Sequence, residues 1–221
     1  MTPVSLDPEP EARTPLSRAR IVRAALKVVD GESLDALTMR RLAAELEVAP
    51  MALYHHFPNK EALYDGIVEA VMGGIDIDAD VPSAPFAARL KYAARAYREV
   101  LAAHPNALPV VLDRAPRTPA SLRPVETMMR ILVDGGLTPA RAFVGVNTVA
   151  ALVQASIRVP AQGKTDARAA GCRDLDRLPD PSPEEFPLLA EARRTEDLDA
   201  EGQFEYGLDA IVRGLAELGL L

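Results

Sequence analysis

The protein has 221 residues, of which 48% are hydrophobic, and 32 acidic residues against 25 lysines and arginines give a net charge of −7. This composition excludes a disordered polyanion, and the single cysteine, Cys172, excludes an intrachain disulfide and a multi-cysteine zinc site. The longest apolar stretch, from Phe143 to Ile157, is too short and too polar to span a bilayer, and the N-terminus lacks a signal-peptide pattern. We therefore expect a cytoplasmic protein with no membrane partner.

Apolar positions recur at helical spacing along nearly the whole chain, and no segment alternates as a β-strand does. The sequence therefore predicts an all-α fold. Residues 1–16, which hold four prolines, are predicted to form a disordered arm. Capping residues, prolines at first helical positions and terminal glycines then predict four helices, at residues 17–30, 38–46, 50–57 and 59–72.

Beyond residue 80 the pattern predicts a helical body. Its expected helices cover residues 83–103, 106–112, the segment after Pro119 up to Gly135, 139–159, 182–193 and 199–218. Residues 160–183 are rich in glycine, proline, aspartate and arginine, and loops of this length are unusual inside a compact domain. We expect this segment to be mobile.

The second and third predicted helices have helix-turn-helix spacing, because only three residues separate them and the later helix is short. In that geometry the helix at 50–57 enters the major groove of DNA while the helix at 38–46 crosses the backbone. The side chains left outside the core of this unit are Met51, Ala52, Tyr54, His55 and His56.

Arg40 and Arg41 lie in the first turn of the helix at 38–46, where positive charge opposes the helix dipole. A DNA phosphate at the Thr38 end would remove this conflict, but two solvated surface arginines fit the local pattern equally well. Residues 13–60 carry eight basic and five acidic side chains, so a locally basic segment stands in an acidic chain. This asymmetry is consistent with a nucleic-acid partner.

The run from Leu37 to Val71 reads LTMRRLAAELEVAPMALYHHFPNKEALYDGIVEAV. It resembles the DNA-binding head of the tetracycline repressor (TetR) family of transcriptional regulators, over about residues 17–72. The most specific part of the match consists of Leu53, Tyr54, His56, Phe57, Asn59, Lys60 and Leu63. Residues 186–218 resemble the C-terminal helices of the tetracycline repressor itself. The resemblance implies a helix-turn-helix DNA-binding domain at 17–60 and a helical effector-binding and dimerisation domain at 61–221.

The resemblance also implies a role in binding operator DNA for each exposed residue of the head. The residues implied to hold phosphates are Thr38, Tyr54, His56 and Lys60. The residues implied to approach base edges are Pro50, Met51, Ala52 and, at the family's variable reading position, His55. Arg40 is implied to contact either the backbone or a base edge. For Tyr54, packing inside the protein is the alternative.

Two residues depart from the family pattern in the turn of this unit. Glu47 stands where the turn commonly has glycine, so we expect a strained or rearranged turn. Ala49 stands where a capping serine is frequent, and this removes one hydroxyl that would bind phosphate. Both departures leave the operator sequence unpredictable.

Two late helices carry continuous apolar seams. In the helix at 139–159 the seam consists of Phe143, Val146, Ala150, Val153 and Ile157. In the last helix it consists of Phe204, Leu208, Ile211, Leu215 and Leu218. This spacing fits a neighbouring helix of the same chain as well as one of a second copy. The family resemblance favours a four-helix dimer interface, which would place two reading helices about 34 Å apart on DNA.

The middle helices are expected to enclose a small-molecule effector. The candidates, each of which also fits an ordinary core position, are Tyr97, Met128, Phe143, Asn147 and Gln154. The resemblance suggests tetracycline with magnesium as the effector. However, the position of the family's metal-binding histidine falls within residues 108–112, which contain none, and Arg158 or a neighbour replaces a late acidic residue. We therefore expect a different effector and no metal or cofactor.

The sequence holds no motif for enzymatic chemistry, because it lacks a phosphate-binding glycine loop, a zinc-protease motif and a serine-hydrolase motif. His55 and His56 are adjacent and point about 100° apart on a helix, so they are poorly placed to hold one metal ion. We expect a homodimeric repressor that an effector releases from its operator. The alternatives are an activator or ligand-independent regulator of the same fold, and a helical small-molecule-binding protein or enzyme.

Overall fold

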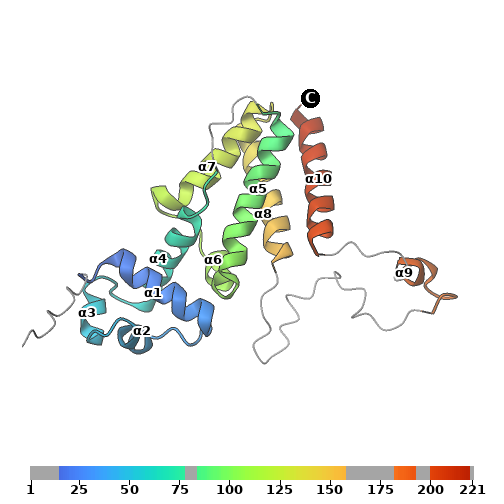
Figure 1. Cartoon of the computed structure of the whole chain (residues 1–221). Helices are drawn as coiled ribbons and strands as arrows, with labels where there is room; N and C mark the ends of the chain where they lie inside the picture. Colours follow the sequence, from blue (N-terminus) through green and yellow to red (C-terminus); the bar gives the residue numbers. More distant parts are fainter. Residues whose placement is uncertain (1–14, 78–83, 158–181, 193–199, 220–221) are drawn as a thin grey trace, which may run out of the picture.

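The structure is a computed structural model that describes residues 15–77, 84–157, 182–192 and 200–219 (Figure 1). Within these ranges every regular element is helical, so the predicted all-α class is confirmed. The predicted disordered arm at 1–16 and mobile loop at 160–183 lie almost entirely outside the described residues. No single helix among those described has the length and hydropathy needed to cross a membrane.

The head of the molecule consists of α1 (Arg18–Gly31), α2 (Met39–Glu45) and α3 (Pro50–Tyr54). The predicted caps are present, because the hydroxyls of Ser17 and Thr38 accept backbone N–H bonds in the first turns of α1 and α2. Proline occupies the first position of α3, as predicted. However, α3 ends three residues earlier than expected. Backbone N–H groups of the turn that follows donate hydrogen bonds to the last turn of α3.

One apolar core joins these helices to α4 (Lys60–Gly73), which begins at its N-cap Asn59, close to the predicted start. The large side chains that are fully buried in the head come from all four helices, the loop before α2 and the turn after α3: Ile21, Leu37, Leu42, Leu53, Phe57, Leu63 and Ile67. The far end of α4 packs against the body, so this helix links the two parts of the molecule (Figure 1).

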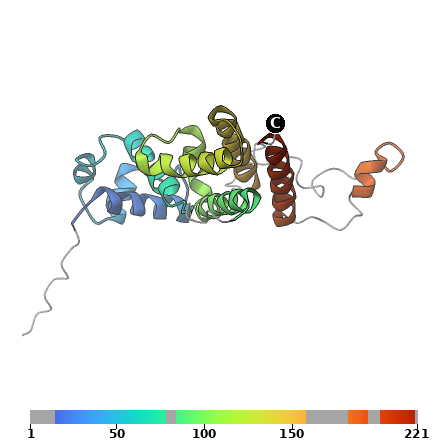
Figure 2. The same cartoon turned by 90° about the horizontal axis from the view of Figure 1, so that it is seen from above.

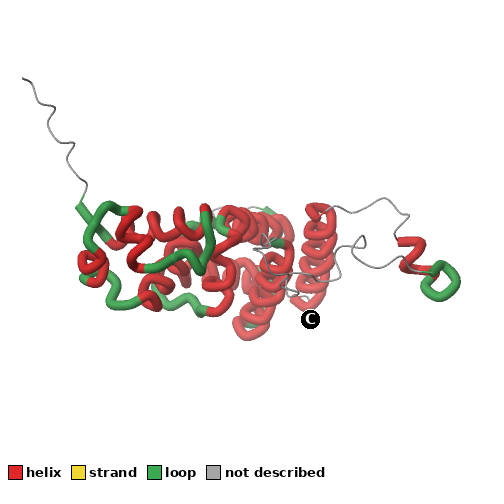
Figure 3. Tube along the Cα trace, turned by 90° about the horizontal axis from the view of Figure 1, so that it is seen from below, coloured by secondary structure: helices red, strands yellow, loops and turns green. Residues whose placement is uncertain are grey.

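Helices also form the body, joined mostly by short loops (Figure 3). They are α5 (Phe86–Ala103), the 3₁₀ turn η1 (Pro105–Ala107), α6 (Leu108–Asp113), α7 (Pro119–Asp134), α8 (Pro139–Ser156), α9 (Pro187–Ala192) and α10 (Ala200–Gly219). α7 packs against α4, α5 and α8, while α10 packs against α5 and α8 (Figure 2). In Figures 1 and 2, α9 lies apart from the other helices.

The turn between α7 and α8 holds the end of α10. Gly136 in this turn has φ 98°, a left-handed conformation that favours glycine. A Cβ at Gly136 would lie 2.5 Å from the carbonyl oxygen of Gly219, so the close approach of the last turn of α10 also requires glycine here.

Five of the ten residues of the two predicted dimer seams are buried inside the single chain, and the other five are half-buried or exposed. The buried members are Val146, Val153, Phe204, Leu208 and Leu215. The half-buried members are Ala150, Ile157 and Ile211, while Phe143 and Leu218 are exposed. The two seams pack into the core that α8 and α10 share with α5 and α7. Apolar periodicity reveals which face of a helix is covered and does not identify the covering helix.

Three ion pairs join α5 to α10 along their length. They link Lys91 to Asp209, Arg95 to Glu205 and Arg98 to Glu201. Arg95 and Glu205 form a two-bond pair with both N···O distances 2.7 Å. The Arg95 guanidinium lowers the pKa of the Glu205 carboxyl, and the Lys91 ammonium lowers that of Asp209. These pairs therefore favour the docked position of α10 when the carboxylates are ionised.

These three ion pairs between α5 and α10 predict a loss of stability in acid. A carboxylate with a lowered pKa in the folded state stabilises the fold above the pKa of the unfolded chain, about 4. The contribution is lost as the pH falls through the lower folded-state value. We expect Glu205→Gln to be less stable than the wild type in urea at pH 7, with the difference shrinking towards pH 3.

The matched control is Glu217→Gln, which changes an exposed carboxylate on the same helix and should leave stability unaltered. A difference between wild type and Glu205→Gln that stays constant from pH 7 to pH 3 would contradict an electrostatic origin.

Candidate nucleic-acid interface

The short helix α3 presents almost all of its surface to solvent. It buries one side chain, Leu53, in the core of the head. Met51 is 69% exposed and Tyr54 is 45% exposed, which are high values for large apolar or aromatic side chains. Pro50 and His55 are exposed as well, and Ala52 and His56 are half-buried. The side chains predicted to lie outside the core therefore do so, and Tyr54 is not a core residue.

The turn before α3 keeps a left-handed residue although no glycine is present. Glu47 has φ 54°, the only positive φ among the described residues that are not glycine. Its backbone N–H donates to the carbonyl of Ala44 (3.2 Å), and that of Val48 donates to Ala43 (3.0 Å). The departure from the family pattern at Glu47 therefore strains the backbone of the turn and does not rearrange the turn. The departure at Ala49 is also visible, since no side chain caps α3.

The structure distinguishes Arg40 from Arg41, for which the sequence left the same two alternatives open. Arg41 donates to Glu32 Oε1 (2.9 Å) and to Glu45 Oε2 (2.9 Å), and Lys27 pairs with the same Glu45 (2.8 Å). These carboxylates raise the pKa of Arg41, and Lys27 and Arg41 lower that of Glu45. Arg40 is exposed and makes no hydrogen bond or ion pair with the residues that the structure describes. Arg40 is therefore the cation available to an external anion.

The remaining predicted phosphate ligands surround α3. Thr38 is exposed at the start of α2, with its hydroxyl used as the cap. Lys60 begins α4 and places its Nζ 5.2 Å from the centroid of the Tyr64 ring. Tyr54 is the last residue of α3, and His56 lies in the turn that follows it. The N-termini of α2 and α4 and the outer face of α3 therefore contribute side chains to one helix-turn-helix unit.

Sequence reasoning missed Arg18, the first residue of α1. Its guanidinium lies over the Phe57 ring, with 4.1 Å between the guanidinium carbon and the ring centroid, and it donates to the His56 carbonyl. No local pattern marks this contact, because the partners are 38 positions apart in the chain.

The predicted effector residues divide into two groups. Tyr97 and Met128 are buried in the body, and the half-buried Gln154 donates from Nε2 to the Tyr97 hydroxyl (3.0 Å). Burial raises the pKa of Tyr97, which keeps the phenol neutral. Phe143 and Asn147 are instead exposed on α8, so their assignment to an effector site stays a prediction.

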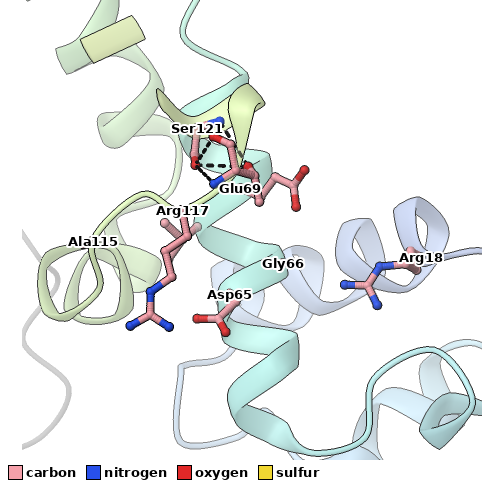
Figure 4. Close-up of a pocket in the computed structure, with 9 residues that line it drawn as sticks. Arg18, Asp65, Gly66, Glu69, Ala115, Arg117 and Ser121 are labelled. Atoms are coloured by element: carbon pink, nitrogen blue, oxygen red, sulfur yellow. Dashed lines mark hydrogen bonds between the residues drawn. The ribbon is translucent and has the colours of Figure 1, made fainter. Parts of the chain in front are cut away.

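A cavity of about 110 Å³ lies where the head meets the body (Figure 4). The carboxylates of Asp65 and Glu69 on α4 line it, together with Arg117 and the buried Ser121 at the start of α7. Arg18 of α1 also contributes to its wall. Tyr97, Met128 and Gln154 are not among its lining residues, so this cavity is separate from the predicted effector residues. Among the described residues, no group of three potential metal ligands comes together.

A capped helix, a tight turn and a short exposed helix, flanked by Arg40 and Lys60, define a helix-turn-helix DNA-binding protein. Residues 21–67 match the family model for bacterial regulatory proteins of the tetR family. Residues 81–218 match the model for the tetracyclin repressor-like C-terminal domain. The chain belongs to the tetracycline repressor (TetR) family.

Individual relatives cover nearly the whole chain. Tetracycline repressor protein class G of Vibrio anguillarum is 28% identical over 211 residues, which span 93% of this chain and 96% of the relative. The crystal structure of apo ActR from Streptomyces coelicolor is 32% identical and superposes with a TM-score of 0.77, covering 94% of this chain and 98% of ActR. ActR has also been solved in complex with actinorhodin, at 31% identity, a TM-score of 0.75 and coverage of 93% and 99%. The protein is a DNA-binding transcriptional regulator and not an enzyme.

The strained turn yields a stability prediction. A left-handed conformation costs an ordinary L-residue about 1–2 kcal/mol, while glycine adopts it without that cost but loses more backbone entropy on folding. We expect Glu47→Gly to raise the free energy of unfolding by about 0.5–1 kcal/mol in urea denaturation.

Glu47→Ala is the matched control, because alanine removes the same charge and keeps the Cβ. It should give no comparable gain. An equal gain in both variants would point to charge repulsion at Glu47 rather than backbone strain.

Proposed function

We propose that the protein is a homodimeric repressor that leaves its operator when a small-molecule effector binds in the helical body. This proposal rests on the observation that α3 buries one side chain, Leu53, in the core and directs its other side chains outward. A helix of this kind beside an exposed Arg40 fits the major groove and its flanking phosphates. Because operator DNA is the partner, the site of action is the cytoplasm.

The exposures of the head residues support a division of labour on DNA. The proposed phosphate contacts come from Thr38, Arg40, Tyr54, His56 and Lys60. The proposed base contacts come from Pro50, Met51, Ala52 and His55, where the apolar groups meet thymine methyls and the imidazole reads the variable position.

The proposed dimer interface lies on the outer faces of α8 and α10 and keeps the exposed seam residues Phe143 and Leu218. Phe143 and Val144 on α8, and Tyr206 and Leu218 on α10, are large side chains exposed by 49–71%. Small exposed residues lie on the same two helices, including Ala151, Ala155, Ala210 and Gly214. Small residues allow a partner helix to approach closely while the larger side chains at the edges are buried. Twofold pairing here would present two copies of α3 to one face of DNA.

The body offers a polar pair for an effector. Tyr97 and Gln154 bridge α5 and α8 in an otherwise apolar interior, with Met128 of α7 also buried. An effector with its own donor and acceptor groups would exchange for this hydrogen bond and bury apolar surface. Residues 108–112, which form most of α6, contain no histidine, so we propose an effector other than tetracycline with magnesium.

Contacts between body and head supply a route for the effector's action. The segment that contains α6 meets the head at both of its ends. His104 Nδ1 lies 2.8 Å from Oδ2 of Asp30 at the end of α1, and Arg114 donates to Asp65 Oδ1 on α4 (2.6 Å). Arg114 also pairs with Glu61. A shift of α6 would therefore act on α1 and α4 together, and an effector that prefers another head separation would lower operator affinity.

Binding to DNA fragments from upstream of the protein's own gene tests the reading role of α3. Tyr54→Phe removes one phosphate-binding hydroxyl and should weaken binding about fivefold at every sequence. His55→Ala should change the preference at one base-pair position. Fluorescence anisotropy on a set of single-base variants measures both effects.

Tyr92→Phe is the matched control, since it removes the hydroxyl of an exposed tyrosine on α5. A change of base preference in Tyr54→Phe would contradict its phosphate role. Failure of the wild-type protein to bind any of these fragments in a salt-dependent manner would overturn the proposal.

Oligomeric state tests the revised dimer face. Ala151→Asp places a charge in the centre of the outer face of α8 and should convert dimers into monomers in sedimentation velocity experiments. Ala102→Asp, at an exposed position near the end of α5, should leave the dimer intact. A wild-type protein that sediments as a monomer at micromolar concentration, or a dimer that tolerates Ala151→Asp, would exclude this face.

A further inference from the structure

The reading helix has little to hold it in place by itself. α3 has five residues, far fewer than an isolated helix needs in water. Its N-terminus lacks a capping side chain, and it anchors one residue, Leu53, in the core. Its position therefore depends on contacts that other elements make with its two ends.

At the C-terminal end, Arg18 provides such a contact. This residue begins α1, and its guanidinium donates to the carbonyl of His56 while lying 4.1 Å from the centroid of the Phe57 ring. The Phe57 ring is fully buried and packs tightly against α4, since a Cβ at Gly66 would lie 3.0 Å from a ring carbon. Arg18 thus ties the end of α3 to a ring that is fixed between α1 and α4.

The chemistry of this position favours arginine. His56 lies two residues beyond the end of α3, so its carbonyl takes no part in the hydrogen bonds of the helix and can accept from a side chain. A guanidinium donates to such a carbonyl in its own plane while its flat face lies on an aromatic ring. An ammonium group has the same charge but no flat face, so lysine does not reproduce both contacts.

We propose that Arg18 is a positioning residue for operator recognition, which fixes the end of the reading helix through the His56 carbonyl and the Phe57 ring. The proposal rests on the DNA-reading role of α3 proposed above. Arg18 acts on sequence-specific binding through α3, whereas a direct phosphate contact would add equally to binding at every sequence. These two roles differ in measurable ways.

The test compares Arg18→Lys with Arg23→Lys, a matched variant at an exposed arginine on the same helix. Anisotropy titrations use the upstream fragment that the wild type binds most tightly and an unrelated fragment of equal length, from 50 to 200 mM KCl. We expect Arg18→Lys to lose about tenfold in affinity for the first fragment, with little change for the second. The slope of log K against log [KCl] should remain that of the wild type. Arg23→Lys should behave as the wild type on both fragments.

Three results would overturn the proposal. Unchanged operator affinity in Arg18→Lys would show that the contact is dispensable. In Arg18→Gln, equal losses on both fragments with a salt slope reduced by about one would identify Arg18 as a phosphate contact. Loss of the folded state in both variants, seen by circular dichroism and thermal unfolding, would assign Arg18 to folding of the head. If the wild type binds no fragment specifically, the proposed function itself fails, which is a separate outcome.

Discussion

A helix of five residues cannot hold itself together in water, and this constraint governs the DNA-reading end of the protein. α3 exists because Leu53 and the following Phe57 are fully buried against α1 and α4. The same burial turns the other side chains of α3 outward. Packing of the core and exposure of the other side chains of α3 are therefore one event.

The charged side chains of the head also fall into two groups, those paired within the chain and those exposed to an external anion. The ion pairs among Lys27, Glu45, Arg41 and Glu32 tie α1 to α2, and they use one of two neighbouring arginines for internal structure. Each exposed pair contributes little to stability, but a connected set restricts the relative position of the helices. Arg40 stays available to an external anion. An acidic chain thus keeps a positively charged edge beside its reading helix, which favours DNA as the anion that is bound.

One face of α10 contacts the same chain, and its outer face is exposed. Its apolar seam and its row of acidic residues both contact the same chain, because Arg95 and its neighbours on α5 pair with the carboxylates beside the buried Phe204 and Leu208. The outer face keeps small residues together with Tyr206 and Leu218. Folding of one chain thereby fixes α10, so the proposed association of two chains would require little rearrangement of this helix.

The sequence by itself determined where most of the helices begin and end, although not the end of α3. Caps such as Ser17 and Thr38, the prolines that start α3, α7 and α8, and terminal glycines act on neighbouring backbone groups. It also determined which side chains of the short reading helix face outward. Only the tertiary structure decided which helix covers the seams of α8 and α10, which of two adjacent arginines is paired, and that Arg18 holds the end of α3. Those choices join residues from 9 to 110 positions apart, such as Arg41 with Glu32 and Arg95 with Glu205. Helical periodicity specifies an apolar or charged face, and the partner of that face is set by chain connections and packing far away in sequence.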